Sequence, residues 1–175
     1  PATIVPVKPL EDSPYEIVDT KERMMEIIAL LQKEPIISFD IREHTVRTYL
    51  GLICMIMDIV RNAQFLLIGT DSCDYLFDTI ALHDHIWNLN AVFTNEKITK
   101  VFGGDELQLL SLQRDFAIYV VNLFSIPQCS KVLSLERDDM QWLLKKYCGV
   151  ELSMLGSRAD WRYGLAGSVM TECDR

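Results

Sequence analysis

The sequence IISFDIREHT, at residues 36–45, carries the strongest structural signal in this chain of 175 residues. An apolar run rich in β-branched residues that breaks abruptly into charge predicts a buried strand, which delivers one side chain to a functional edge of a sheet. Asp40 is that side chain. Because side chains alternate along a strand, Arg42 is expected on the same face as Asp40. A cation therefore stands where a second ligand would be expected.

Composition is that of an ordinary globular protein with one domain. Hydrophobic residues make up 49% and charged residues 24% of the chain, which is long enough for a sizeable core. The net charge of −8 has the wrong sign for strong sequence-independent binding of nucleic acid, so any such contact must be local. Five scattered cysteines without a C-x-x-C pair favour a reducing compartment over a zinc site or a disulfide framework. Neither a membrane span nor a signal peptide is predicted, so we expect a protein that is not secreted.

Hydrophobic spacing predicts strands that alternate with helices. The expected strands are 17–18, 36–41, 49–60, 64–68, 75–78, 99–102 and 119–124. The expected helices are 19–33, 83–93, one from 103–106 with Leu107, Leu110 and Phe116 on one side, 126–133, 140–148 and one from 168 onward. This alternation predicts an α/β domain with a central sheet and helices on both faces.

The N-terminal residues are expected to differ from the rest of the chain. Residues 1–14 hold four of the six prolines and no helical period, which predicts an extended arm on the surface or on a partner. The folded domain is then expected over 15–175. Within it, 64–68 is predicted to return from 49–60 in a hairpin. Whether 64–68 or 75–78 is the main strand of the sheet stays open, and the other would be an extension.

Several blocks of the sequence carry a family resemblance. They are FDIREH at 39–44, VFGG at 101–104 through LQRDF at 112–116, YVVNLF at 119–124, LLKKYC at 143–148 and ADWR at 159–162. Together they resemble the RNase D family of 3′-to-5′ exonucleases, and within it the type found in the nuclear exosome. The resemblance runs from about Val5 to Arg175, with an insertion around 61–73. It implies a ribonuclease H-like exonuclease fold.

The resemblance also implies a chemistry that this chain carries only in part. Members of the family cleave phosphodiesters with two divalent metals, which four carboxylates from three motifs hold. The first motif, Asp-x-Glu, reads Asp40-Ile41-Arg42, so the Glu has become Arg. A guanidinium about 5 Å from a divalent ion would repel it by roughly 6 to 7 kcal/mol at an effective dielectric constant near 20. We therefore expect Arg42 to pair with Asp40 and to replace the lost metal charge.

The second motif is altered as well. Gly103-Gly104 stands for His-Gly, and Gln108 occupies the position of the acid. Its neutral amide is a poor ligand for magnesium. Asp105 lies one helical turn before Gln108 and shares its face, so it is either a relocated ligand or, as is commoner for an acid in a first turn, a capping residue. The two glycines resemble a phosphate loop, but a tight strand-to-helix turn explains them better because the longer fingerprint is missing.

The third motif falls at the end of the chain. Counting from the ADWR block puts Cys173 at the position of the Tyr that orients the attacking water. The last Asp would fall two residues beyond Arg175, so we expect the domain to be truncated in this motif. No cofactor is expected on this reading. If the site still works, Mg²⁺ or Mn²⁺ is required, and Asp40 and Asp105 are the candidate ligands.

Basic residues gather in the C-terminal third of the chain. They either line the former nucleic-acid groove or form a solvated helix face of mixed charge. These residues are Lys145, Lys146, Arg158 and Arg162.

Three functions are compatible with these features. The preferred hypothesis is a degenerate exonuclease domain that is catalytically inactive and binds RNA or protein in a nuclear, or otherwise intracellular and reducing, RNA-processing complex. The alternative is an active, metal-dependent 3′-to-5′ exoribonuclease of the exosome type. The third is a structural or dimerisation subunit, which would use residues 1–14 to dock on a partner or on a second copy.

Overall fold

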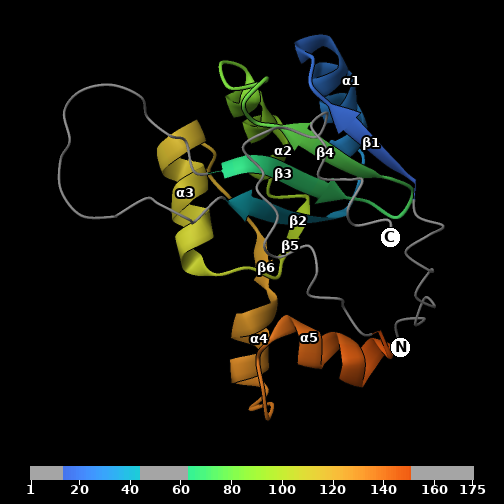
Figure 1. Ribbon diagram of the computed structural model, residues 1–175, viewed down its shortest axis with the longest axis vertical. Helices are drawn as coiled ribbons and strands as arrows, with labels where there is room; N and C mark the ends of the chain where they lie inside the picture. The colour runs from blue at the N-terminus through green and yellow to red at the C-terminus, as the bar shows by residue number, and fades with distance from the viewer. Residues whose placement is uncertain (1–13, 44–62, 151–175) are drawn as a thin grey trace, which may run out of the picture.

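A computed structural model describes residues 14–43 and 63–150 of the chain (Figure 1). Within these ranges one mixed sheet of six strands has the order β1-β4-β3-β2-β5-β6. The strands are β1 (Tyr15–Val18), β2 (Ile36–Glu43), β3 (Ala63–Gly69), β4 (Asp74–Asp78), β5 (Thr99–Phe102) and β6 (Leu123–Ser125). The helices are α1 (Lys21–Leu31), the 3₁₀-helix η2 (Ile86–Leu89), α2 (Asn90–Phe93), α3 (Glu106–Phe116), α4 (Ile126–Val132), α5 (Met140–Leu143) and the π-helix η3 (Leu144–Cys148). The predicted α/β class is confirmed.

Strand β2 lies inside the sheet, antiparallel to β3 and parallel to β5. Its side chains Phe39 and Ile41 are buried. The Phe39 ring stacks on Phe102 of β5 with 4.6 Å between centroids and meets Phe93 of α2 edge to face at 5.1 Å. Such pairs contribute about 0.5 to 1.5 kcal/mol each beyond burial. The predicted buried strand is therefore confirmed, and its aromatic packing fixes the strand that precedes Asp40.

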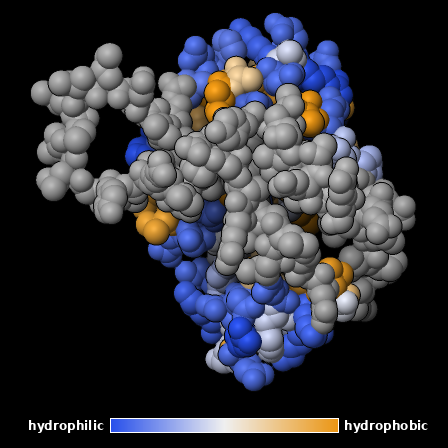
Figure 2. Space-filling model, viewed as in Figure 1, coloured by the Kyte–Doolittle hydropathy of each residue, from blue (hydrophilic) through white to orange (hydrophobic). Residues whose placement is uncertain are grey.

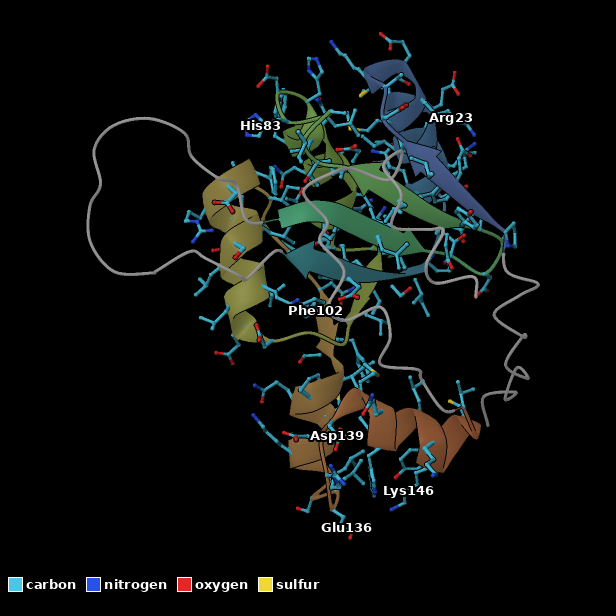
Figure 3. The ribbon with its side chains drawn as sticks, in the orientation of Figure 1. Arg23, His83, Phe102, Glu136, Asp139 and Lys146 are labelled. Atoms are coloured by element: carbon cyan, nitrogen blue, oxygen red, sulfur yellow. The ribbon has the colours of Figure 1, made fainter. Side chains whose placement is uncertain are left out.

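Helix α1 follows its predicted pattern. Its buried face is made by Met24, Ile27, Ile28 and Leu31. On its other side, Arg23 (labelled in Figure 3) forms a bidentate ion pair with Glu16 of β1, with Nε to Oε1 at 2.5 Å and Nη2 to Oε2 at 2.9 Å. This pair holds the pKa of Glu16 below its usual value. It ties the helix to the edge strand β1.

The middle of the sheet differs from the prediction. Residues 49–60, the predicted second strand, lie outside the described ranges. Strand β3 pairs with both β2 and β4, so β3 and β4 are both strands of the main sheet and neither is an extension. Each has a buried face, made by Leu66 and Ile68 in β3 and by Tyr75 and Phe77 in β4. The insertion predicted around 61–73 relative to the family stays a prediction.

Helix α3 turns a different face to the core than predicted. Leu107 and Leu110 are 69% and 56% exposed, and hydrophobic surface is visible over α3 in Figure 2. Leu112 and Phe116 are buried, and Leu109 packs partly against the core. Positions 109, 112 and 116 form one helical stripe, so the leucines at 107 and 110 necessarily fall outside it.

Strand β6 is shorter than the predicted 119–124. Asn122 has a φ of 57°, in the left-handed region, which interrupts an extended run. Its carbonyl oxygen accepts the backbone N–H of Lys100, so the pairing with β5 starts only there. The helix predicted from residue 83 likewise begins later, as η2 at Ile86.

Residues 126–150, which we call the C-terminal arm, extend away from the sheet below β6 (Figure 1). Within the arm only Ser130 and Leu143 are buried. The arm therefore adds surface to the molecule rather than core. In the described part of the chain, no helix is both long and apolar enough to cross a membrane.

Candidate functional site

The candidate site lies where β5 ends and where its pairing with β2 stops, at Phe39. The two strands are parallel and Phe39 pairs with Phe102, so Asp40 and the turn that starts at Gly103 follow at the same edge of the sheet. Helix α3 begins after this turn and carries Gln108 in its first turn. The carboxyl edge of parallel strands is where α/β proteins usually place their ligands. The structure thus brings the first and second predicted motifs together.

Asp40 is half-buried at the site. Its Oδ1 accepts the backbone N–H of Ile41 at 2.9 Å. The backbone of Arg42 belongs to β2, but its side chain lies outside the described part of the structure. The predicted ion pair between Asp40 and Arg42 stays a prediction.

Gln108 makes three hydrogen bonds, one of which joins α3 to β2. Its Nε2 donates to the carbonyl oxygen of Ile41 at 3.0 Å. Its Oε1 accepts the backbone N–H of Asp105 at 3.1 Å, and its own backbone N–H donates to Asp105 Oδ1 at 3.0 Å. The last two bonds form a capping box. Gln108, which the family resemblance puts at the position of the second-motif acid, therefore fastens the start of the helix to the strand, next to Asp40.

Of the two roles considered for Asp105, a relocated metal ligand or a capping residue, the structure shows the capping residue. It has extended backbone angles, and its carboxylate accepts an N–H of the first turn. That N–H would otherwise have no partner at the start of a helix. The capping role of Asp105 is confirmed.

Little room is left for side chains at the two glycines of the turn between β5 and α3. A Cβ atom on Gly104 would meet Gln108 Oε1 and would lie 2.5 Å from Phe102 Cζ. A Cβ atom on Gly103 would meet the terminal methyl of Met140, the first residue of α5. The tight-turn interpretation is confirmed. The close contact with Met140, which the sequence did not indicate, places the start of α5 against the edge of the site.

The residues described here do not fit a centre for two divalent metals. Gln108 is neutral, its carbonyl oxygen already accepts a hydrogen bond, and Mg²⁺ prefers carboxylate oxygens. The Asp105 carboxylate is engaged at the helix cap. Across residues 14–43 and 63–150, no group of three or more His, Cys, Asp or Glu could hold a metal ion.

The other predicted site residues lie elsewhere. Cys173, Arg158 and Arg162 are outside the described residues. Lys145 and Lys146 are exposed and belong to η3 in the C-terminal arm. The structure thus brings together Asp40, Asp105 and Gln108 but places the two lysines on a different element.

Known proteins are similar to this chain in sequence over nearly its whole length. The profile of the 3′-5′ exonuclease family matches residues 15–173. Protein RRP6-like 1 of Arabidopsis thaliana is 38% identical over 168 residues, which cover 94% of this chain and 25% of that protein. Exosome complex exonuclease RRP6 of Saccharomyces cerevisiae is 34% identical over 95% of this chain and 21% of that protein. The chain thus spans a quarter or less of the length of these two relatives.

Solved structures agree with the sequence comparison. The catalytic core of RRP6 from Trypanosoma brucei superposes with a TM-score of 0.80 at 27% identity, covering 92% of this chain and 42% of that one. RNase D of Escherichia coli, at 18% identity, has a TM-score of 0.68 over 84% of this chain and 36% of that one, and this likeness shows the fold alone. The RNase D-like fold expected from the resemblance is confirmed. The chain therefore belongs to the 3′-5′ exonuclease family.

Proposed function

We propose that this domain is a degenerate exonuclease domain, which binds RNA or protein in an RNA-processing complex and does not cleave RNA. The observation that carries the proposal is the hydrogen bonding of the Gln108 side chain. Gln108 stands at the position of the second-motif acid, and its side chain is committed to the Ile41 carbonyl and to the Asp105 N–H. A residue in that role stabilises the site as a structural element.

Charge supports the same conclusion. In a reaction with two metals, the ions stabilise the attacking and the leaving oxygen, and clustered carboxylates hold the ions. At this edge Asp40 and Asp105 each accept a backbone N–H, and Gln108 contributes no charge. If Arg42 also points to this face, its guanidinium cancels the charge of Asp40. The remaining functions of such a domain are binding and scaffolding.

The partners are proposed from the relatives. Exosome complex component 10 homolog of Drosophila melanogaster is 33% identical over 90% of this chain and 17% of that protein. A place in an assembly of the exosome type, in the nucleus or another reducing compartment, follows by analogy. The proposal concerns the full-length protein that carries this domain.

A nuclease assay separates the inactive domain from an active exoribonuclease, which family membership favours. The full-length protein is incubated with 3′-labelled single-stranded RNA in Mg²⁺ and, separately, in Mn²⁺. We expect the RNA to keep its length with both the wild type and the Asp40→Asn variant. Stepwise shortening by the wild type that Asp40→Asn abolishes would show instead that the site is active.

A further inference from the structure

The C-terminal arm carries a cluster of two aromatic rings and a lysine on α5 and η3. The Nζ of Lys146 lies 4.1 Å from the centre of the Trp142 ring and 5.8 Å from that of Tyr147. The two rings meet edge to face, with 6.5 Å between centroids and an angle of 84°. We call Trp142, Lys146 and Tyr147 the aromatic cluster.

The π-helix η3 is what brings the two rings together. Trp142 and Tyr147 are five residues apart, and in a regular α-helix such positions point about 140° away from each other. The wider turn of η3, over Leu144–Cys148, rotates Tyr147 back toward Trp142. Short π-helical segments are uncommon and occur frequently at functional sites. The geometry of the cluster therefore depends on a local departure from the α-helix.

Within the aromatic cluster, Lys146 and Tyr147 are exposed and Trp142 is half-buried. Tyr147 is 61% exposed, and the last turn of η3 carries the basic residues Lys145 and Lys146. Figure 3 shows Lys146 on the C-terminal arm, well below the sheet. In a chain with a net charge of −8, the two adjacent lysines of η3 are a local basic feature.

Three acids lie just before α5, and one of them, Asp139, is engaged by protein groups. Asp139 accepts the backbone N–H of Trp142 at 2.9 Å through one carboxylate oxygen. Its other oxygen pairs with Arg137 Nε at 2.8 Å. Glu136 and Asp138 are exposed in the segment that leads to the helix. The acids thus lie in the segment between α4 and α5, whereas the aromatic cluster lies on α5 and η3.

We propose that the aromatic cluster binds single-stranded RNA. Exposed aromatic rings provide faces on which bases stack, and nearby lysines contact the phosphates, which is how proteins bind single strands with little sequence preference. The start of α5 packs against the turn at Gly103, so a strand held by the arm lies beside the former nuclease site. This inference rests on the proposed function and names the RNA-binding face. Lysines next to stacking rings match a polyanion better than a protein surface.

Binding of RNA by the full-length protein tests the proposal. Fluorescence anisotropy is measured with a labelled oligouridine of about 12 nucleotides, within the range of known site sizes, in EDTA so that cleavage cannot interfere. We expect Tyr147→Ala to weaken binding about 5- to 100-fold, which corresponds to the loss of one stacked base. Tyr147→Phe keeps the ring and should bind within about twofold of the wild type.

The lysine is tested with a matched control on the same arm. Lys146→Gln keeps a long side chain but removes the charge, and it should lower the slope of log affinity against log salt by about 0.7. Lys131→Gln, at the exposed end of α4, should leave that slope unchanged. Circular dichroism would show whether Tyr147→Ala unfolds the arm. If it does, the salt dependence of Lys146→Gln still tests whether the aromatic cluster binds RNA.

Two results would overturn the proposal. One is equal affinity of the wild type, Tyr147→Ala and Lys146→Gln for the oligouridine. The other is no binding by the wild type at about 50 mM salt, where phosphate contacts are strong, and this would leave a protein as the occupant of the face. Cleavage of RNA in Mg²⁺ would contradict the proposal that the domain is inactive. It would not test whether Tyr147 contacts RNA.

Discussion

At the scale of single residues, Gln108 is the side chain on which the site depends. Gln108→Ala leaves the Ile41 carbonyl and the Asp105 N–H without their partners. We expect the free energy of unfolding to fall by about 1 to 3 kcal/mol. Urea denaturation measures the change.

Gln113→Ala is the matched control for Gln108→Ala. Gln113 lies on the same helix and is exposed, so its loss should change stability by less than about 0.5 kcal/mol. Equal effects of the two substitutions would mean that the hydrogen bonds of Gln108 do not hold α3 to β2.

Lys100 is a second residue whose surroundings the sequence did not reveal. Its side chain is buried, and Nζ donates to the carbonyl oxygens of Ile98, at 2.8 Å, and Asn95. Burial lowers the pKa of the amine from its ordinary value of 10.5. Between the lowered pKa and 10.5 the unfolded chain binds more protons at this site than the folded one, so stability rises with pH in that window.

Substitution of Lys100 tests this dependence on pH. The free energy of unfolding is measured for the wild type and for Lys100→Met from neutral pH to about pH 10. The free energy of unfolding of the wild type should increase relative to that of Lys100→Met as the pH rises toward 10.5, the ordinary pKa of lysine. The exposed neighbour Lys97 supplies the control variant Lys97→Met, for which no such shift is expected. If the free energies of unfolding of the wild type and Lys100→Met differ by the same amount at every pH, burial does not lower the pKa of Lys100.

At the scale of elements, α3 shows that a leucine-rich helix can bury either of two stripes. Leu112→Ala should cost about 2 to 5 kcal/mol, because it empties part of the core. Leu107→Ala makes the same chemical change on the exposed face and should cost less than about 0.5 kcal/mol. Thermal or urea unfolding of both variants measures the contrast. Similar costs would mean that Leu107 is covered in the protein.

The same helix marks how far sequence reasoning reaches. Its start at Asp105 was predictable because a capping acid and a Gly-Gly turn are local signals. Its buried face was not, because leucines at 107, 109, 110 and 112 satisfy two helical stripes equally well. The choice depends on the sheet against which the helix packs. Likewise, β6 was predicted too long because nothing local shows that Asn122 adopts a left-handed conformation.

The candidate site was predictable in position but not in its bonds. Asp40 at the end of a buried strand and Gln108 in the first turn of a helix follow from spacing and family resemblance. The bond from Gln108 to the Ile41 carbonyl joins residues 67 apart in sequence, so only the folded structure shows it. The aromatic cluster was missed for a similar reason, because a π-helical turn has no sequence signature that distinguishes it from an α-helix.

At the scale of the whole molecule, the exonuclease fold is kept, and Asp40, Asp105 and Gln108 at the candidate site are engaged in protein hydrogen bonds. The sheet and α3 form the frame of the site, and the C-terminal arm carries the exposed lysines of η3. The function that we propose for this domain is binding within a larger assembly. Its nuclease chemistry is what we propose it has lost.

Titration of the full-length protein with Mn²⁺, followed by electron paramagnetic resonance of the free ion, tests that loss directly. A two-metal site would remove free Mn²⁺ from solution in a saturable way and would require Asp40. We predict no saturable binding that depends on Asp40, with identical titrations for the wild type and Asp40→Asn. Saturable binding by the wild type that Asp40→Asn abolishes would contradict the proposal.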